Sequence, residues 1–92
     1  MLTLADCIAF SDLLPEEIDE ICCHERLGFM VALTKGHSFL ERPWGPTAIR
    51  QMMRDNLTRL MRGGELKRAV PTLETYHRFQ ARHPGGVERR AA

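Results

Sequence analysis

The stretch that decides the fold runs from residue 16 to residue 40 and reads EEIDEICCHERLGFMVALTKGHSFL. It is the densest apolar sequence in the chain, and it holds two of the three cysteines and two of the four histidines. Two series of residues recur in it at helical spacing: Ile18, Ile21 and Cys22, then Phe29, Ala32, Leu33, Gly36 and Leu40. If the first series continued, the charge of Glu25 would be buried, so the helix should end near there. Gly28, three residues later, provides the break. The stretch therefore predicts two helices with a break near Gly28.

Turn residues divide the rest of the chain into three more helical segments. Thr3 and Asp6 match a helix start and predict a short helix to about residue 10. A Pro-rich loop at 42–46 separates the helix of 29–40 from one of about 46–62. Gly63-Gly64 ends that helix, and a last one covers about 65–82 with Pro71 inside it. No β-like alternation persists, so we expect an all-α fold, a small array or bundle of about five helices.

The apolar pattern also predicts which side chains are buried. In the fourth segment the apolar stripe has Asn56 near its middle, so this amide should be buried with a hydrogen-bond partner. In the fifth segment we expect a buried face, with Tyr76 beside it: Leu66, Ala69, Val70, Leu73 and His77. Phe79 falls away from this face, so it is predicted to be an exposed aromatic that contacts another subunit.

The length of 92 residues fits one domain, near the size at which a single core gives modest stability. We expect a single helical domain over 1–83 and a flexible C-terminal tail over 84–92, where turn residues and charges replace the apolar pattern. The N-terminus carries Asp6 and no basic region, so it does not match a secretory signal, and no apolar run could span a bilayer. Three cysteines make a poor disulfide framework, which favours the cytoplasm.

The net charge of +1 conceals two oppositely charged halves. Residues 1–41 hold two basic and eight acidic residues, a balance of −6, and residues 42–92 hold eleven basic and four acidic, a balance of +7. Such halves neutralise each other inside one fold or between copies, or they leave a basic face for an acidic partner. Neutralisation within one fold is the commoner arrangement.

Two groups of polar residues could carry chemistry. Cys22, His24, Glu74 and His77 are candidate metal ligands, but paired zinc motifs are absent, and adjacent helical residues point about 100° apart. We therefore favour a buried Cys22 and no metal or other cofactor, and keep metal binding or redox chemistry as an alternative function. His37, Asn56 and His77 would form a buried polar cluster if their helices pack together, either as a ligand pocket or as an internal hydrogen-bond network.

The sequence favours association over catalysis. No GxSxG, P-loop, HExxH or GxGxxG motif occurs, so we expect no enzyme. The leading hypothesis is a noncatalytic helical protein that binds itself, as a homodimer, or another protein, as an adaptor or regulatory subunit. Its candidate partner contacts are Trp44, Phe79, Arg50 and Arg54, although we favour Trp44 as a lid that closes one end of the core. Nonspecific nucleic-acid binding through the arginines of 46–62 is a second alternative, not favoured because solvated arginine faces are common.

Overall fold

The computed structural model describes residues 3–89, which form five α-helices and no strand. The helices are α1 (Leu4–Ser11), α2 (Pro15–Glu25), α3 (Phe29–Leu40), α4 (Gly45–Arg62) and α5 (Leu66–Arg82). The all-α fold, the break near Gly28 and the interruption within 42–46 are thus confirmed. Pro71 lies inside α5 without splitting it.

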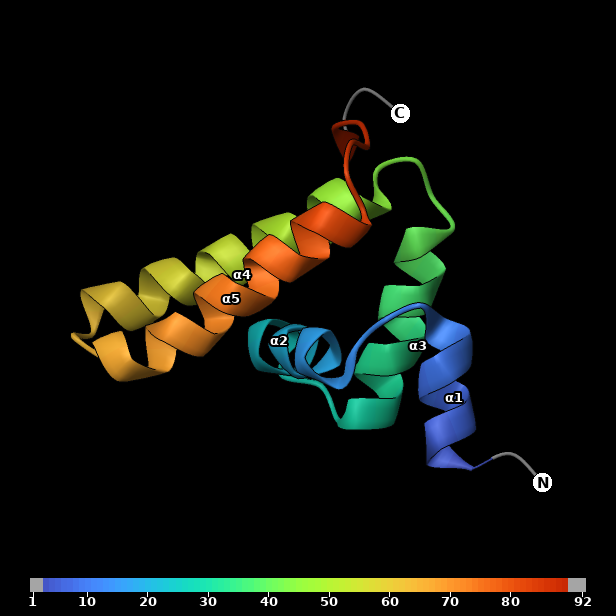
Figure 1. Cartoon of the computed structure of the whole chain (residues 1–92), viewed down its shortest axis with the longest axis horizontal. Coiled ribbons are helices and arrows are strands. Elements are labelled where there is room, and N and C mark those ends of the chain that lie inside the picture. The colour runs from blue at the N-terminus through green and yellow to red at the C-terminus, as the bar shows by residue number, and fades with distance from the viewer. Residues whose placement is uncertain (1–2, 90–92) are drawn as a thin grey trace.

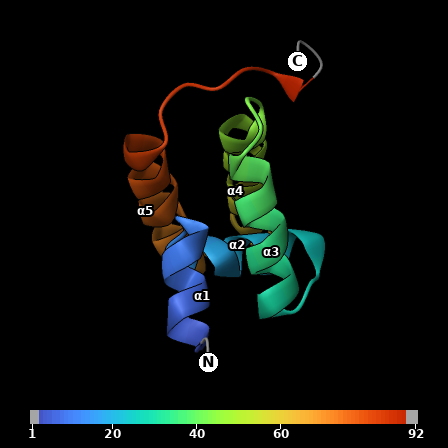
Figure 2. The same cartoon turned by 90° about the vertical axis from the view of Figure 1, so that its right-hand side faces the viewer.

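The helices pack as an irregular array rather than a parallel bundle. Helices α4 and α5 form a long antiparallel hairpin, and α2 lies across it (Figure 1). Helix α3 packs against both α2 and α4, and the short α1 packs on α3 (Figure 2). Helices α2 and α4 contact each other, and both also contact α3 and α5, so the array is organised around the crossing of α2 and α4. None of the five helices in residues 3–89 has both the length and the apolar character of a transmembrane segment.

Helices α1 and α2 both begin with capping hydrogen bonds, and the start of α1 at Thr3 and Asp6 is the one predicted. The Thr3 hydroxyl accepts from the Asp6 backbone N–H at 3.1 Å, and the Asp6 carboxylate accepts from the Thr3 N–H at 3.0 Å. These hydrogen bonds hold the pKa of Asp6 below its ordinary value. At α2, Pro15 begins the helix and the Glu17 carboxylate accepts from the Leu14 N–H at 2.7 Å.

The core lies where α2, α3 and α4 meet. Its members include Ile18, Ile21, Ala32 and Leu33 from the two predicted series, together with Ile49, Met52 and Met53 of α4, while Cys22, Phe29 and Leu40 are partly buried against it. Gly36 is buried among them, and a Cβ there would come within 2.6 Å of Leu13 Cδ1 and 2.7 Å of Ile21 Cδ1. Gly36 therefore lets the side chains of Leu13 and Ile21 pack directly on the backbone of α3.

Asn56 is buried as predicted, with 2 % of its surface exposed. Its amide nitrogen donates to the Glu20 backbone oxygen at 2.9 Å and to Glu20 Oε1 at 3.1 Å. Thr72 Oγ1 donates to the other Glu20 carboxylate oxygen at 3.1 Å. This network joins α2, α4 and α5 at one point, and it satisfies the polar groups that the crossing of three helices buries.

The predicted orientation of α5 is wrong. Its buried residues are Ala69, Thr72, Thr75 and Phe79, whereas Leu66, Val70, Leu73 and His77 are exposed. The helix turns its small residues and threonines inward, where Thr72 binds Glu20 and Thr75 Oγ1 donates to the Pro71 carbonyl at 2.9 Å. Specific contacts with α2 and α4 thus override the apolar stripe, which is left facing outward.

Candidate functional site

The most distinctive surface of the molecule is an apolar stripe on the outer side of α5. Leu66, Val70 and Leu73 are 61 %, 54 % and 41 % exposed, and their spacing places them on one side of the helix. Single exposed aliphatic residues are ordinary, but three in register on one helix form a continuous face. We call Leu66, Val70 and Leu73 the α5 stripe.

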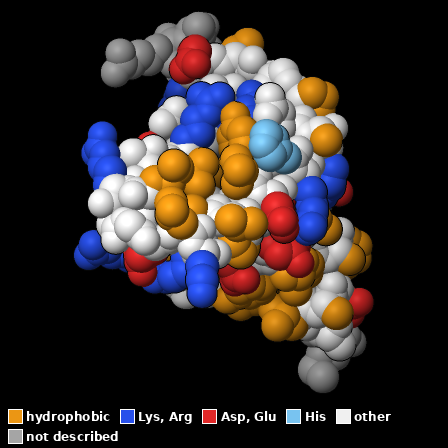
Figure 3. Space-filling view, turned by 60° about the vertical axis from the view of Figure 1, so that its left-hand side comes forward, with side chains coloured by type: hydrophobic (Ala, Val, Ile, Leu, Met, Phe, Trp, Pro, Cys, Tyr) orange, Lys and Arg blue, Asp and Glu red, His pale blue; other side chains and the backbone are white. Residues whose placement is uncertain are grey.

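Cations border the α5 stripe on both sides. Lys67 and Arg78 are exposed on one flank of the helix, together with Glu74, which lies 4.0 Å from Arg78 Nη2. On the other flank is Tyr76, which contacts Arg54 of α4. Figure 3 views the hairpin end of the molecule and shows hydrophobic side chains in the middle of this face, with lysine and arginine side chains, a histidine and some acidic side chains around them. The surface is therefore apolar along its centre and mainly basic along its edges.

Arg54 is held beside the stripe by a tyrosine. Its Nε and Nη2 donate to the Tyr76 hydroxyl at 3.1 and 2.9 Å, and its guanidinium carbon lies 5.5 Å from the centre of the Tyr76 ring. Part of the guanidinium still faces solvent, because Arg54 is exposed. Arg54 is thus placed where a partner of opposite charge could reach it.

Arg50, the second arginine predicted to contact a partner, is turned toward its own chain. Its Nη1 donates to the His83 carbonyl at 2.7 Å, and its Nη2 donates to Thr47 Oγ1 at 3.3 Å and to the Gly85 carbonyl. The Val87 N–H donates to the Pro43 carbonyl at 3.0 Å. Residues 83–89 therefore contact the start of α4. The prediction of a flexible tail over 84–92 did not include these contacts, and residues 90–92 of that tail lie outside the described part of the chain.

Trp44, a third predicted contact, closes one end of the core. It is half-buried, and its ring packs edge-on against Phe39 with the centroids 4.8 Å apart. The guanidinium of Arg89 lies 4.1 Å from the centre of the indole. These contacts cover much of the ring from within the chain.

Phe79 is not a surface contact. The side chain is fully buried in the main core cluster, and its ring centroid lies 4.8 Å from that of His83. The prediction of an exposed aromatic is wrong because the face opposite to the expected one packs inward. Leu66, Val70 and Leu73, which the apolar periodicity predicts to be buried, are exposed instead.

The predicted polar cluster does not form. Asn56 is bonded to Glu20, while His77 is exposed on the outer side of α5. His37 lies at the other side of the core, where Nδ1 is 3.4 Å from the Ser11 carbonyl and Nε2 is 3.2 Å from Glu41 Oε1. Asn56 and Thr72 instead both donate to Glu20, a contact between three helices that the pattern of one helix cannot predict.

The candidate metal ligands are also dispersed. Residues 3–89 contain no group of three His, Cys, Asp or Glu side chains arranged to hold a metal ion. Glu74 lies beside Arg78, and His24 lies between Glu25 Oε2 at 2.8 Å and Asp55 Oδ2 at 2.9 Å. Burial, with a smaller effect of Asp19, raises the pKa of the Cys22 thiol and so disfavours the reactive thiolate.

The cluster around His24 joins α2, α3 and α4 through charged side chains. The Lys35 ammonium donates to Glu25, which holds the pKa of that carboxyl below its ordinary value with help from His24. A hydrogen bond from Gln51 at 2.9 Å, and a second from His24, lower the pKa of Asp55. The groups pair with one another, so the arrangement is explained by the packing of the three helices.

Comparison of the chain with protein-family models, with curated proteins and with solved structures finds no match. The function must therefore be argued from the surfaces of this molecule.

Proposed function

We propose that this protein is a noncatalytic adaptor that binds an acidic, amphipathic helix of another protein across the α5 stripe. The observation that supports this function is the exposure of Leu66, Val70 and Leu73 in helical register. Helix α5 buries one face in its own fold and exposes a second, apolar face that is available to a partner. Docking of a partner helix on such a face is a recurring mode of recognition, with contacts spaced at i, i+4 and i+7.

The charge around the stripe favours an acidic partner. Lys67 and Arg78 border it on one side and Arg54 on the other, while the nearby carboxylates are Glu74 and Glu65, and Glu65 is paired with Arg68. The half of the chain that contains α4 and α5 carries a balance of +7. Aspartate and glutamate beside the apolar residues of a partner would complement these cations, steer the encounter and fix the orientation.

The same charges disfavour a second copy on this face. In a twofold dimer, equivalent surfaces meet, so the basic edges of the two stripes would lie against each other. The acidic residues of the first half could reach the stripe of another copy only in a head-to-tail contact, which continues into open assemblies unless it closes a ring. A separate acidic partner avoids both difficulties.

A peptide-display selection tests this function. A library of randomised helical peptides is selected against the full chain and, in parallel, against Val70→Asp, which adds a carboxylate to the exposed stripe. Peptides enriched on the unchanged protein should have apolar residues at i, i+4 and i+7 flanked by acidic residues, and they should not bind Val70→Asp. Val31→Asp on α3, where the side chain is 57 % exposed, is the matched control and should bind as the unchanged protein does.

Three results would contradict the proposal: no enrichment, enrichment of basic peptides, or equal binding to the Val70→Asp variant. Sedimentation equilibrium provides the complementary measurement. A dimer that Val70→Asp dissociates would show that a second copy covers the stripe, and the acidic partner would then be rejected.

A further inference from the structure

The outer face of α3 carries no charge along its centre and is exposed in the part of the chain that the structure describes. Met30 and Val31 are 48 % and 57 % exposed, and Thr34 and Ser38 are exposed beside them. Their spacing places all four on the side of the helix opposite to the residues that it buries. We call Met30, Val31, Thr34 and Ser38 the α3 face.

The shape of the α3 face suits an identical helix. Side chains four residues apart form a ridge along a helix, and a groove separates neighbouring ridges. One ridge consists of Met30, Thr34 and Ser38, and the next contains Val31 and Lys35. These five residues line a shallow groove on the surface. Because α3 presents both a ridge and a groove of the same spacing, the ridge of one copy fits the groove of another about a twofold axis.

Thr34, in the middle of this face, is suited to burial. Its Oγ1 donates to the Met30 carbonyl at 2.9 Å, so the hydroxyl keeps a hydrogen bond when another helix covers it. Its side chain and that of Ser38 are short, which lets two helix axes approach to about 8 Å. The apolar contact would then come mainly from Met30 and Val31.

The charges at the edge of the α3 face are balanced. Lys35 is the only Lys, Arg, Asp or Glu in α3. Its ammonium donates to Glu25 of α2, and both side chains keep part of their surface exposed. A twofold contact would bring this ion pair beside the same pair of the other copy, so that each ammonium gains a second carboxylate nearby. The charges of two such faces are therefore complementary.

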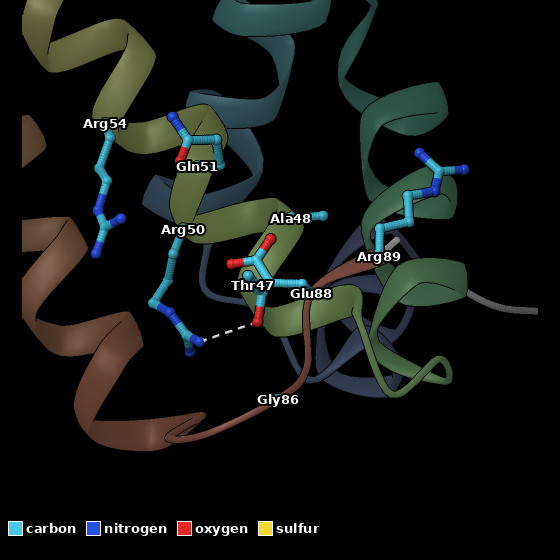
Figure 4. A pocket seen from close by; sticks show the side chains of 8 residues that line it. All are labelled: Thr47, Ala48, Arg50, Gln51, Arg54, Gly86, Glu88 and Arg89. Atoms are coloured by element: carbon cyan, nitrogen blue, oxygen red, sulfur yellow. Dashed lines mark hydrogen bonds between the residues drawn. The ribbon is translucent and has the colours of Figure 1, made fainter. Parts of the chain in front are cut away.

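The hollow at the start of α4 lacks this balance. Figure 4 shows Arg54 and Arg89 at opposite ends of it and directed away from each other, with Arg50 bonded to Thr47. Three guanidinium groups against the single carboxylate of Glu88 would meet the same excess of positive charge in a twofold contact. The basic edges of the α5 stripe have the same effect. Of these three surfaces, the α3 face is the one whose charges favour a second copy.

We propose that two copies of this chain associate through the α3 face, with the two α3 helices crossing about a twofold axis near Thr34. Figure 1 places α3 and the loop that joins α4 to α5 on opposite sides of the molecule. The α5 stripe begins next to this loop at Leu66, so the dimer leaves both stripes exposed. A dimer of this kind would present two docking surfaces, and a partner with two suitable helices would bind it with increased avidity.

Sedimentation equilibrium of the full chain over a range of concentrations tests this contact. The unchanged protein should form dimers, and Val31→Asp should weaken the association at least about tenfold, because each copy then brings a carboxylate into an apolar contact. Val70→Asp is the matched control, since it makes the same substitution at a valine that is 54 % exposed on α5. It should dimerise like the unchanged protein. Circular dichroism should show the same helical content in both variants.

Crosslinking locates the twofold axis. Thr34→Cys, made together with Cys23→Ser to remove the exposed native thiol, should form a disulfide between two copies when diamide is the oxidant. Thr58→Cys in the same background is the control, because Thr58 is an exposed threonine of α4 away from the α3 face. It should crosslink far more slowly. A dimer that links the two copies equally through residue 34 and residue 58 would contradict the proposed axis.

Three further results would overturn the proposal: a protein that stays monomeric up to about 100 μM, a dimer that Val31→Asp leaves intact, or a monomer that binds lipid vesicles through Val31. This inference does not depend on the proposed adaptor function. Val31→Asp should dissociate the dimer and keep peptide binding by each chain, whereas Val70→Asp should do the reverse. Loss of one property without the other therefore shows which of the two proposals fails.

Discussion

Glu17 is the most unusual residue in the core, because its charged side chain has no exposed surface. Both carboxylate oxygens accept from Arg82 Nη1 at 2.7 Å, and Oε1 also accepts from the Leu14 N–H. Arg82 Nη2 donates further to the Asp12 carbonyl at 2.8 Å. The pair ties the end of α5 to the start of α2, and it joins the acidic half of the chain to the basic half.

Removing the two partners of this pair should have unequal effects. Arg82→Ala leaves the Glu17 carboxylate buried without its counterion, which should cost about 3 kcal/mol of unfolding free energy or more. Glu17→Gln should cost roughly 1–2 kcal/mol, because Arg82 is partly exposed and can turn to water. Urea denaturation at neutral pH measures both values. Equal losses of unfolding free energy in the two variants would mean that the burial of the unpaired Glu17 carboxylate adds no cost of its own.

The Glu25 carboxyl should make the fold sensitive to acid. Because its pKa in the folded protein lies below the ordinary value of 4.5, Glu25 stabilises the fold fully above that pH, and the contribution is lost as pH falls through the folded pKa. Lys35→Met removes the main cause of the shift. Carboxyl NMR titration should then show the pKa of Glu25 rising toward its ordinary value, and acid unfolding should begin at a higher pH. An unchanged pKa would contradict the assignment of Lys35 as the cause.

At the scale of the element, α5 shows where sequence reasoning holds and where it fails. Its extent was predicted to within one residue, because Gly63-Gly64 and His83-Pro84 interrupt the helical pattern at its two ends. The orientation of α5 was predicted wrongly, because its apolar stripe faces solvent. The buried face carries Thr72, which donates to Glu20 of α2, and Thr75, which donates to the Pro71 carbonyl of α5 itself. A helical wheel ranks faces by hydrophobicity, whereas the buried face of α5 depends on residues of other helices.

The same limit explains the candidate site. Asn56 could be predicted to be buried because its own helix surrounds it with apolar residues, but its partner Glu20 lies 36 positions away. The Arg50 guanidinium likewise donates to the carbonyls of His83 and Gly85, which lie 33 and 35 positions away. Arg50 and Arg54 were recognised as surface cations, but the contacts that orient them come from α5 and the segment after it.

A pair of truncations on α5 tests its orientation. Phe79→Ala should destabilise the fold by about 3–4 kcal/mol, because it leaves a cavity in the main core cluster. Leu73→Ala should cost less, about 1 kcal/mol, because its side chain is 41 % exposed and its removal leaves no cavity in the core. Denaturant midpoints at neutral pH give both values. The reverse order would show that the apolar stripe faces the core and would remove the basis of the proposed docking surface.

At the scale of the whole molecule, direct ion pairs between the acidic first half and the basic second half neutralise only part of their opposite charges. Among residues 3–89, the ion pair of Arg82 with Glu17 joins an arginine of the second half to a carboxylate of the first, while Arg68 and Arg78 pair within α5 or at its start. Most arginines of α4 and α5 are exposed. The commoner arrangement expected from the sequence, neutralisation inside one fold, is therefore achieved only in part by direct pairs.

This residual basic surface makes the salt dependence of partner binding informative. Affinity for an acidic peptide selected on the α5 stripe should fall severalfold as ionic strength rises from about 50 mM to about 500 mM, because salt screens exposed charges. It should then level off, since the contacts with Leu66, Val70 and Leu73 do not depend on screening. Fluorescence anisotropy of the labelled peptide measures the dependence. Arg54→Gln should reduce the slope and leave the high-salt affinity unchanged. An affinity that rises with salt throughout would indicate that the stripe binds by apolar contact alone, and that its basic edges do not select the partner.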